Sequence, residues 1–275
     1  MTPSLTVGFL PSLTIMSTAK DKLIVALDVD DANRALELCD ALRESVGMFK
    51  VGMQLFTAAG PDVVRQIIAR GGRVFLDLKY HDIPNTVAMA GVEATRLGVS
   101  IFNVHASGGS EMMKRAAEAV AETAQRETLA KPRVIAVTVL TSIDQQTLQQ
   151  IGIAEEAESV VTRLAFLAKH SGLDGVVASA QEIRTIRDAV LDPDFLVVIP
   201  GIRGASASSD DQRRTMSAGD AVKAGANYLV IGRPILAAPD PTDAARRIVE
   251  EIAAALKAEP QPADLAEQSH AQSVY

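Results

Sequence analysis

The chain has 275 residues and a formal net charge of −7, and 48% of its residues are hydrophobic. This length and apolar content fit one large α/β domain or two smaller ones, and they exclude a disordered chain. The acidic balance, the 4% of aromatic residues and the absence of tryptophan argue against nucleic acid or an anionic membrane as a partner.

The two ends of the chain and its cysteine content fit a cytoplasmic protein. Residues 1–20 contain an apolar patch, but they lack a basic N-terminal region and Pro11 interrupts the patch, so we expect a loose extension rather than a signal peptide. Cys39 is the single cysteine, which fits a reducing cytoplasm. No apolar run reaches the roughly 18 residues of a transmembrane helix. Residues 258–275 are rich in Ala, Gln, Pro and Ser, and we expect a disordered tail.

Between these ends, short β-rich runs alternate with amphipathic helical patterns. The predicted strands are residues 23–29, 48–53, 73–79, 101–106, 133–140, 173–179, 195–200 and 227–232. The predicted helices are residues 34–44, 61–70, 87–98, 111–125, 154–170, 181–190, 217–225 and 241–258.

Eight strands that are each followed by a helix predict a single (β/α)8 TIM barrel over residues 21–257. The strands are near-continuous runs of Val, Ile and Leu, as in a parallel sheet that helices cover. A doubly wound open sheet is the alternative. It usually has fewer strands and a glycine-rich phosphate loop after the first strand, and no GxGxxG motif stands there.

Polar residues fall at the carboxyl ends of the predicted strands, where a TIM barrel carries its active site. Because side chains alternate between the faces of a strand, Asp77 and Lys79 should share the barrel interior while Leu76 and Leu78 face the helices. Lys50 on the second strand can point into the same mouth. A structural salt bridge is the alternative, but a buried ion pair often fails to offset its own desolvation, so several such charges favour catalysis.

A second polar group follows the seventh and eighth strands and favours a phosphate ligand. Gly201 and Arg203 follow the seventh strand, and Gly232 and Arg233 follow the eighth. Loops at these positions form the common phosphate site of the fold, where glycine admits close backbone approach and arginine supplies a bidentate fork. Turn glycines with solvated arginines are the alternative. The polar segment 204–215, with Gln212, fits either a lid over the phosphate or a loop without a role.

The histidines give weaker signals, and no metal site is predicted. His105 and His81 could act in acid–base chemistry, although a hydrogen-bonded structural role fits His105 better. The chain has no HxxxH, CxxC or GxSxG motif.

The run Asp77-Leu78-Lys79-Tyr80-His81-Asp82-Ile83-Pro84-Asn85-Thr86 resembles the signature of the orotidine 5′-phosphate decarboxylase family. Further similar segments run in order along the predicted barrel: ALDVD (26–30), FKVGMQLF (49–56), NVHASGG (103–109), VTVLTS (137–142), GLDGVV (172–177), PGIR (200–203), DQRR (211–214) and IGRP (231–234). The set resembles the bacterial branch of the family, and no motif position departs from it.

The resemblance implies loss of CO2 from orotidine 5′-phosphate, the last step of UMP synthesis, without a metal or organic cofactor. It implies that Lys79 donates a proton to C6 of the pyrimidine, that Asp77 lies near the substrate carboxylate, and that Lys50 and Asp82 complete the charge network. It also implies a homodimer, in which Asp82 and Thr86 reach into the neighbouring site. The remaining implied contacts are Asp28 and Lys50 on the ribose, Thr141 on the pyrimidine, and Arg203, Gln212, Gly232 and Arg233 on the phosphate.

Three other functions stay open at this point. A related barrel that uses metal-assisted chemistry on sugar phosphates, such as a keto-gulonate phosphate decarboxylase or a hexulose phosphate synthase, would carry an acidic ligand near the position of Lys50. A Schiff-base aldolase would need Lys79 as a free amine, which the flanking carboxylates disfavour. A non-catalytic nucleotide-binding protein would not need Asp77, Lys79 and Asp82 together.

Overall fold

The structure is a computed structural model that describes residues 19–202 and 216–258. Two of the predicted phosphate ligands, Arg203 and Gln212, lie outside the described residues, as does the segment 204–215. Most of the expected extension and most of the expected tail also lie outside them.

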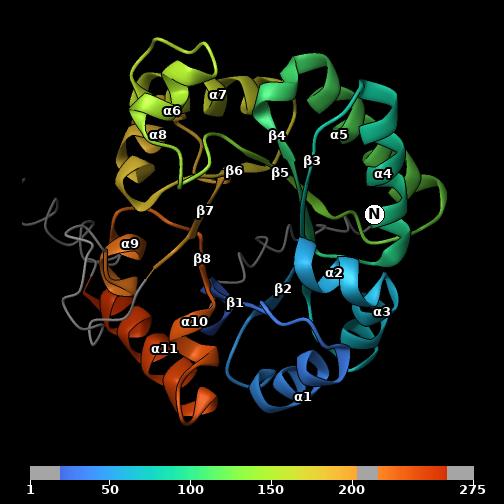
Figure 1. Ribbon diagram of the computed structural model, residues 1–275, viewed down its shortest axis with the longest axis vertical. Helices are drawn as coiled ribbons and strands as arrows, with labels where there is room; N and C mark the ends of the chain where they lie inside the picture. Colours follow the sequence, from blue (N-terminus) through green and yellow to red (C-terminus); the bar gives the residue numbers. More distant parts are fainter. Residues whose placement is uncertain (1–18, 203–215, 259–275) are drawn as a thin grey trace, which may run out of the picture.

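Eight strands form a closed parallel barrel in which each strand pairs with its neighbours in the chain and β8 pairs with β1 (Figure 1). The strands are β1 (Leu23–Ala26), β2 (Met48–Gly52), β3 (Val74–Tyr80), β4 (Ile101–His105), β5 (Arg133–Val137), β6 (Gly175–Val177), β7 (Leu196–Pro200) and β8 (Tyr228–Ile231). The predicted TIM barrel is therefore confirmed, and the doubly wound open sheet is excluded because the sheet has no edge in the described chain.

Helices surround the barrel (Figure 1). The α-helices are α1 (Ala32–Leu42), α2 (Met53–Ala59), α3 (Asp62–Ala69), α4 (Pro84–Leu97), α5 (Gly109–Arg126), α6 (Gln145–Gln150), α7 (Ala157–His170), α8 (Ile183–Ala189), α9 (Ala218–Lys223), α10 (Arg233–Leu236) and α11 (Pro241–Lys257). Short 3₁₀ helices are η1 (Lys20–Lys22), η2 (Ala106–Gly108) and η3 (Ala180–Glu182). No helix in the described part of the chain is long and apolar enough to cross a membrane.

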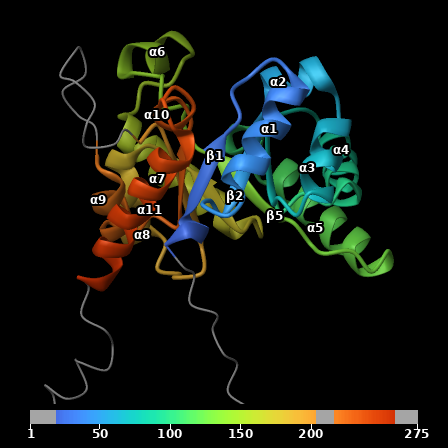
Figure 2. The same cartoon turned by 90° about the horizontal axis from the view of Figure 1, so that it is seen from below.

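The main departures from the predicted elements lie at the carboxyl ends of the strands. β5 ends at Val137 rather than at residue 140, and α2, α6 and α10 follow β2, β5 and β8 where no separate helix was predicted. These three helices lie at one end of the barrel, the upper end in Figure 2. Each has seven residues or fewer, too short for a helical hydrophobic period to stand out.

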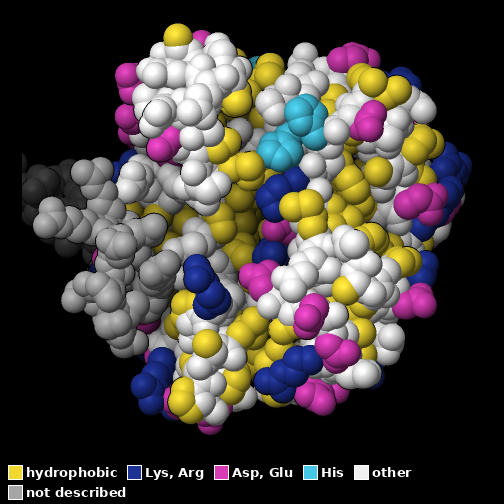
Figure 3. All heavy atoms as spheres, in the orientation of Figure 1, with side chains coloured by type: hydrophobic (Ala, Val, Ile, Leu, Met, Phe, Trp, Pro, Cys, Tyr) yellow, Lys and Arg dark blue, Asp and Glu magenta, His cyan; other side chains and the backbone are white. Residues whose placement is uncertain are grey.

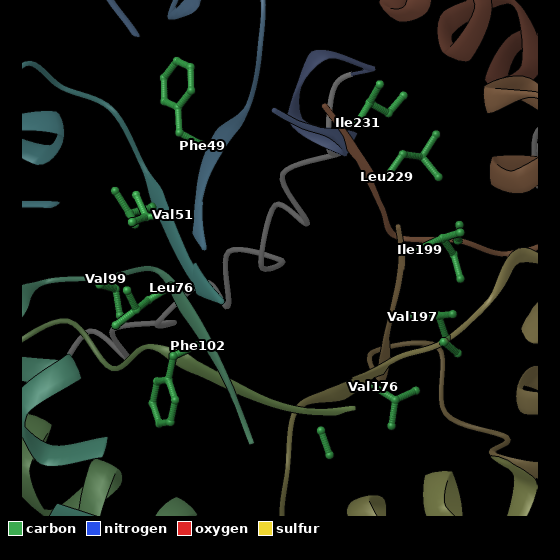
Figure 4. Close-up of a cluster of buried hydrophobic side chains, with 14 of the residues drawn as sticks. Phe49, Val51, Leu76, Val99, Phe102, Val176, Val197, Ile199, Leu229 and Ile231 are labelled. Carbon is green, nitrogen blue, oxygen red and sulfur yellow. The ribbon is translucent and has the colours of Figure 1, made fainter. Parts of the chain in front are cut away.

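The core has two layers that follow from the alternation of side chains along each strand. Outward-facing residues such as Val51, Leu76 and Phe102 are fully buried against the helices (Figure 4). The inward-facing residues fill the barrel: Ile24, Ala26, Met48, Phe75, Ile101, Ile135, Val137, Val177, Val198 and Val230. The barrel is thus a packed core rather than a pore.

The inward-facing rows change from apolar to polar toward the carboxyl ends of three neighbouring strands. Two residues beyond Met48, Phe75 and Ile101, on the same face of β2, β3 and β4, stand Lys50, Asp77 and Asn103. The apolar layer below therefore closes the floor under a polar layer at the barrel mouth. This arrangement positions the candidate site.

Candidate active site

Four of the predicted residues form a continuous chain of alternating charge at the barrel mouth. The Lys79 ammonium lies 2.6 Å from Asp77 Oδ1, and the Lys50 ammonium lies 3.3 Å from Asp77 Oδ2. Lys50 also donates to Asp28 Oδ1 at 3.2 Å. The order Asp28, Lys50, Asp77, Lys79 links β1, β2 and β3, and the predicted meeting of Asp77, Lys79 and Lys50 is confirmed.

Asp77 is the centre of this chain, and its surroundings hold it ionised. Its side chain is only 13% exposed. Burial alone would raise the pKa of Asp77, but the charges of Lys50 and Lys79, with hydrogen bonds from Lys79 and Asn103, outweigh it and leave the pKa below its usual value. Because a buried carboxylate without partners would become neutral, the two lysines keep a negative charge at this point of the mouth.

Lys79 has a left-handed backbone, with φ of +52°. This conformation costs a residue with a side chain about 1–2 kcal/mol. It coincides with an irregularity in the pairing of β3 with β4. Leu76 pairs with Phe102 and Tyr80 pairs with Val104, so three residues of β3 lie opposite the single residue Asn103 of β4. The strand bulges where Asp77 and Lys79 enter the mouth.

Asn103 occupies the gap that the bulge leaves. Its side-chain oxygen accepts the backbone N–H of Lys79 at 2.8 Å, and its side-chain nitrogen donates to Asp77 Oδ1 at 2.7 Å. Asn103 is fully buried. In the sequence, Asn103 falls within the predicted strand 101–106 and begins the motif NVHASGG, but no role was assigned to it. The available signal was a lone amide in an apolar strand.

Two glycines leave room for the charged groups. A Cβ on Gly52 would lie 2.8 Å from the Lys50 ammonium, which is closer than such atoms approach. A Cβ on Gly232 would lie 3.1 Å from Asp28 Oδ2. The predicted phosphate residue Gly232 is therefore next to the predicted ribose residue Asp28, across the junction of β8 and β1.

Asp82 lies on the exposed segment that joins β3 to α4, and Thr86 is exposed in the first turn of α4. Asp82 accepts the backbone N–H of Ile83 at 2.6 Å, and among the described residues it forms no ion pair with Lys79. A cavity of about 330 Å³ borders this segment, and Lys79, Asp82 and Thr86 all line it. The structure therefore places Asp82 and Thr86 around a cavity that Lys79 reaches, but it does not place Asp82 in the charge chain of its own protomer.

The other predicted residues take separate places around the mouth. Thr141 is exposed in the turn after β5, and Arg233 is exposed at the first position of α10. Gly201 follows β7 with φ of +78°, a left-handed value that glycine adopts without strain. Nothing in the described contacts ties these three residues to the charge chain.

The histidines flank the charged group. The rings of His81 and His105 lie 5.5 Å apart. Partial burial lowers the pKa of His105, and the nearby His81 and Lys79 lower it further against the opposing effect of Asp77. The lowered pKa favours the neutral form of the His105 imidazole. Figure 3 shows a hollow in this face, with basic and acidic side chains gathered at one side of it and histidines beside them.

The donor set does not resemble a metal centre. Among the described residues, no group of three or more His, Cys, Asp or Glu side chains is arranged to hold a metal ion. The position next to Asp77 and Asp28 that a cation could have taken is filled by the Lys50 ammonium.

The sequence profile of the orotidine 5′-phosphate decarboxylase / HUMPS family matches residues 21–248. The chain belongs to this family. The match spans the whole barrel, which confirms the resemblance drawn from the motifs.

Curated relatives extend the likeness over most of the chain. The orotidine 5′-phosphate decarboxylase of Geotalea daltonii is 56% identical over 236 residues, which cover 86% of this chain and 98% of the relative. The corresponding protein of Moorella thermoacetica is 56% identical over 85% of this chain and 93% of its own length. The solved structure of orotidine 5′-phosphate decarboxylase from Lactobacillus acidophilus is 37% identical, with a TM-score of 0.75 over 84% of this chain and 98% of that one.

Replacing Gly52 with alanine tests the packing of the Lys50 ammonium. The φ of Gly52 is −92°, which alanine adopts freely, so the new methyl group acts through its contact with Lys50. We expect Gly52→Ala to lower kcat/KM for orotidine 5′-phosphate about tenfold or more, since small misplacements in a site are costly. Gly219→Ala is the control, because its methyl group would meet no atom closer than 3.4 Å. Equal activity of the two variants would contradict the expectation.

The lowered pKa of Asp77 predicts a pH-dependent stability difference. A carboxyl whose folded pKa lies below the unfolded value of about 3.9 stabilises the fold above that value, and the contribution disappears as pH falls through the folded pKa. The gap in unfolding free energy between the wild type and Asp77→Asn should therefore be constant above about pH 5 and shrink below about pH 4. Urea unfolding at a series of pH values measures this gap, and a gap independent of pH would refute the assignment.

Proposed function

We propose that this chain decarboxylates orotidine 5′-phosphate to UMP and CO2, with Lys79 as the proton donor. The family and the relatives at 56% identity over more than four fifths of the chain support the reaction. The observation that carries the mechanism is the chain of alternating charge from Asp28 to Lys79 at the barrel mouth. This row of charged side chains holds the Lys79 ammonium and the Asp77 carboxylate side by side at a fixed position.

The reaction breaks the bond between C6 of the pyrimidine and its carboxylate carbon. The bonding electrons stay on C6, CO2 leaves as a neutral molecule, and a proton from the Lys79 ammonium bonds to C6. At about 4 Å, opposite unit charges attract by on the order of 4 kcal/mol at an effective dielectric of 20. Because Asp77 and the backbone already fix the ammonium, little reorganisation is needed as the negative charge develops. Lys79 then regains its proton from water.

Asp77 contributes through its own charge. We place it next to the carboxylate of the bound substrate, where two negative charges raise the energy of the ground state. Departure of CO2 relieves this repulsion. The lowered pKa of Asp77 supports the proposal, because only the ionised carboxyl can repel the substrate carboxylate. The same charge orients Lys79 through the contact of 2.6 Å.

The rest of the substrate would lie along the mouth. Asp28 and Lys50, joined at 3.2 Å, would bind the ribose hydroxyls, and Thr141 would contact the pyrimidine. Gly232 and Arg233 would bind the phosphate together with Arg203 and Gln212. The proximity of Gly232 to Asp28 supports neighbouring ribose and phosphate positions. Phosphate binding far from the reacting bond supplies binding energy that can be used in the transition state.

No metal or organic cofactor is required in this proposal, because Lys79 both stabilises charge and supplies the proton. The family name also includes HUMPS, so the second candidate is a barrel that uses metal-assisted chemistry on sugar phosphates. The lysine at position 50 disfavours this candidate, since an ammonium repels a cation where such a barrel would need an acidic ligand. The single, buried Cys39 supports a cytoplasmic setting.

We further propose a homodimer in which Asp82 and Thr86 enter the site of the partner subunit. Both residues are exposed, Asp82 between β3 and α4 and Thr86 in the first turn of α4, and Asp82 has no ion pair with the Lys79 of its own chain among the described contacts. Two apolar side chains of the same region are exposed, Ile83 by 66% and Met89 by 49%. An apolar surface that carries candidate site residues fits an interface around a two-fold axis.

A spectrophotometric assay tests the reaction. Wild-type protein with orotidine 5′-phosphate and excess EDTA should lose the orotate absorbance and yield UMP, whereas Lys79→Ala should be at least about 10³-fold slower, since it loses both the charge and the proton donor. Circular dichroism would verify that the variant is folded. Absence of turnover by the folded wild-type protein would refute the decarboxylase function, and turnover abolished by EDTA would favour the metal-dependent alternative.

Mixing two inactive variants tests the shared site. Lys79→Ala and Asp82→Ala should each be nearly inactive, but their heterodimer has one site with both residues intact. Random reassociation makes about half of the dimers mixed, with one of two sites active, so about a quarter of wild-type activity should return. A mixture of Lys79→Ala and Asp77→Ala is the control, because both residues belong to one chain's network. Recovery in neither mixture, despite confirmed heterodimers, would refute the shared site.

A further inference from the structure

We infer that Asn103 is a positioning residue for the reaction, because its amide group fixes the left-handed backbone of Lys79 and the carboxylate of Asp77 at the same time. The inference rests on the proposed function, and it concerns a residue that has no contact with the charges of the substrate in that proposal. It begins with the irregular pairing of β3 and β4.

The bulge in β3 removes the usual backbone partner of Lys79. Leu76 pairs with Phe102 and Tyr80 with Val104, so the three residues from Asp77 to Lys79 face one residue of β4. A backbone N–H in this buried place needs an acceptor, because leaving it unpaired is costly. The Asn103 oxygen is that acceptor, at 2.8 Å.

This hydrogen bond and the unusual conformation of Lys79 occur together. A lysine seldom adopts a φ of +52° without support. The conformation directs the Lys79 ammonium to within 2.6 Å of Asp77 Oδ1. Asn103 therefore acts on the position of the ammonium through the backbone and not through its charge.

The other half of the amide acts on Asp77. The Asn103 nitrogen donates to Asp77 Oδ1 at 2.7 Å, the same oxygen that Lys79 contacts. Asn103 belongs to a strand with no exposed backbone at this point and is itself 0% exposed, so it has little freedom to move. One rigid group thus sets both members of the pair that performs the chemistry.

An amide is the neutral side chain that can do both tasks at this length. It offers an acceptor to the N–H of Lys79 and a donor to the carboxylate of Asp77. An ionised aspartate would keep the acceptor but place a second negative charge against Asp77. A protonated aspartate would restore the donor. In Asn103→Asp, which has nearly the same shape, the protonated side chain can therefore make both wild-type hydrogen bonds, and the ionised side chain cannot.

Steady-state kinetics of Asn103→Ala and Asn103→Asp test the inference. We expect Asn103→Ala to lower kcat about 100-fold, because a shift of about 1 Å in a catalytic group can cost that much, with KM changed less than about threefold, since ribose and phosphate contacts are intact. Asn103→Asp should lose activity relative to the wild type as pH rises and its carboxyl ionises. Ser171→Ala is the control, because it removes the hydrogen bond of another buried side chain, beyond the end of α7, without contact with the charge chain.

The outcomes separate this inference from the proposed function. If the wild type does not decarboxylate, the proposed function fails. If it does, and Asn103→Ala keeps kcat within about threefold, or Asn103→Asp follows the wild-type pH profile, the positioning role is refuted. Should Asn103→Ala fail to fold, the pH profile of Asn103→Asp decides alone, because a merely structural asparagine would not give activity that titrates.

Discussion

The contact between Lys79 and Asp77 is the interaction on which the site depends. The Asp77 carboxylate could not stay ionised at the mouth of an apolar barrel alone, because desolvation would favour its neutral form. Lys79, with Lys50 on the far side of Asp77, holds the Asp77 carboxylate ionised. The apolar layer that ends at Phe75 and Met48 gives these charged groups a floor without competing polar groups. The barrel therefore supplies a fixed electrostatic field, and the substrate brings the charge on which that field acts.

The eightfold alternation of strand and helix could be predicted from the sequence because each element carries its own period. Buried parallel strands are continuous Val and Ile runs, and the longer helices have clear amphipathic faces. The short helices α2, α6 and α10 escaped prediction because they lie at the mouth. There, apolar and polar residues are arranged by the site and not by packing against the sheet, so local periodicity carries little information. For the same reason, the carboxyl end of β5 was predicted at residue 140, whereas the strand ends at Val137.

The site itself was predictable in part. Alternation along β3 was enough to bring Asp77 and Lys79 together, and the end of β2 was enough to add Lys50. The bulge, the positive φ of Lys79 and the two hydrogen bonds of Asn103 were not predictable, because each depends on the register between β3 and β4. Register is a relation between two strands that are distant in the sequence, and the alternation within one strand does not show where it bulges against the other. The spaces left by Gly52 and Gly232 are likewise visible only once the neighbouring strands are in place.

The bulge has a consequence for the strand beyond it. Relative to β4, the segment from Leu76 to Tyr80 holds two additional residues, which is an even number. In a structure of period two, an even insertion restores the original alternation, whereas an odd insertion would exchange the inner and outer faces. Tyr80 accordingly still packs outward, with its ring 6.0 Å from that of Phe102. Because the insertion is even, the strand can distort at Lys79 and still direct Tyr80 toward the helix-facing core. The distortion therefore does not spread into the barrel wall.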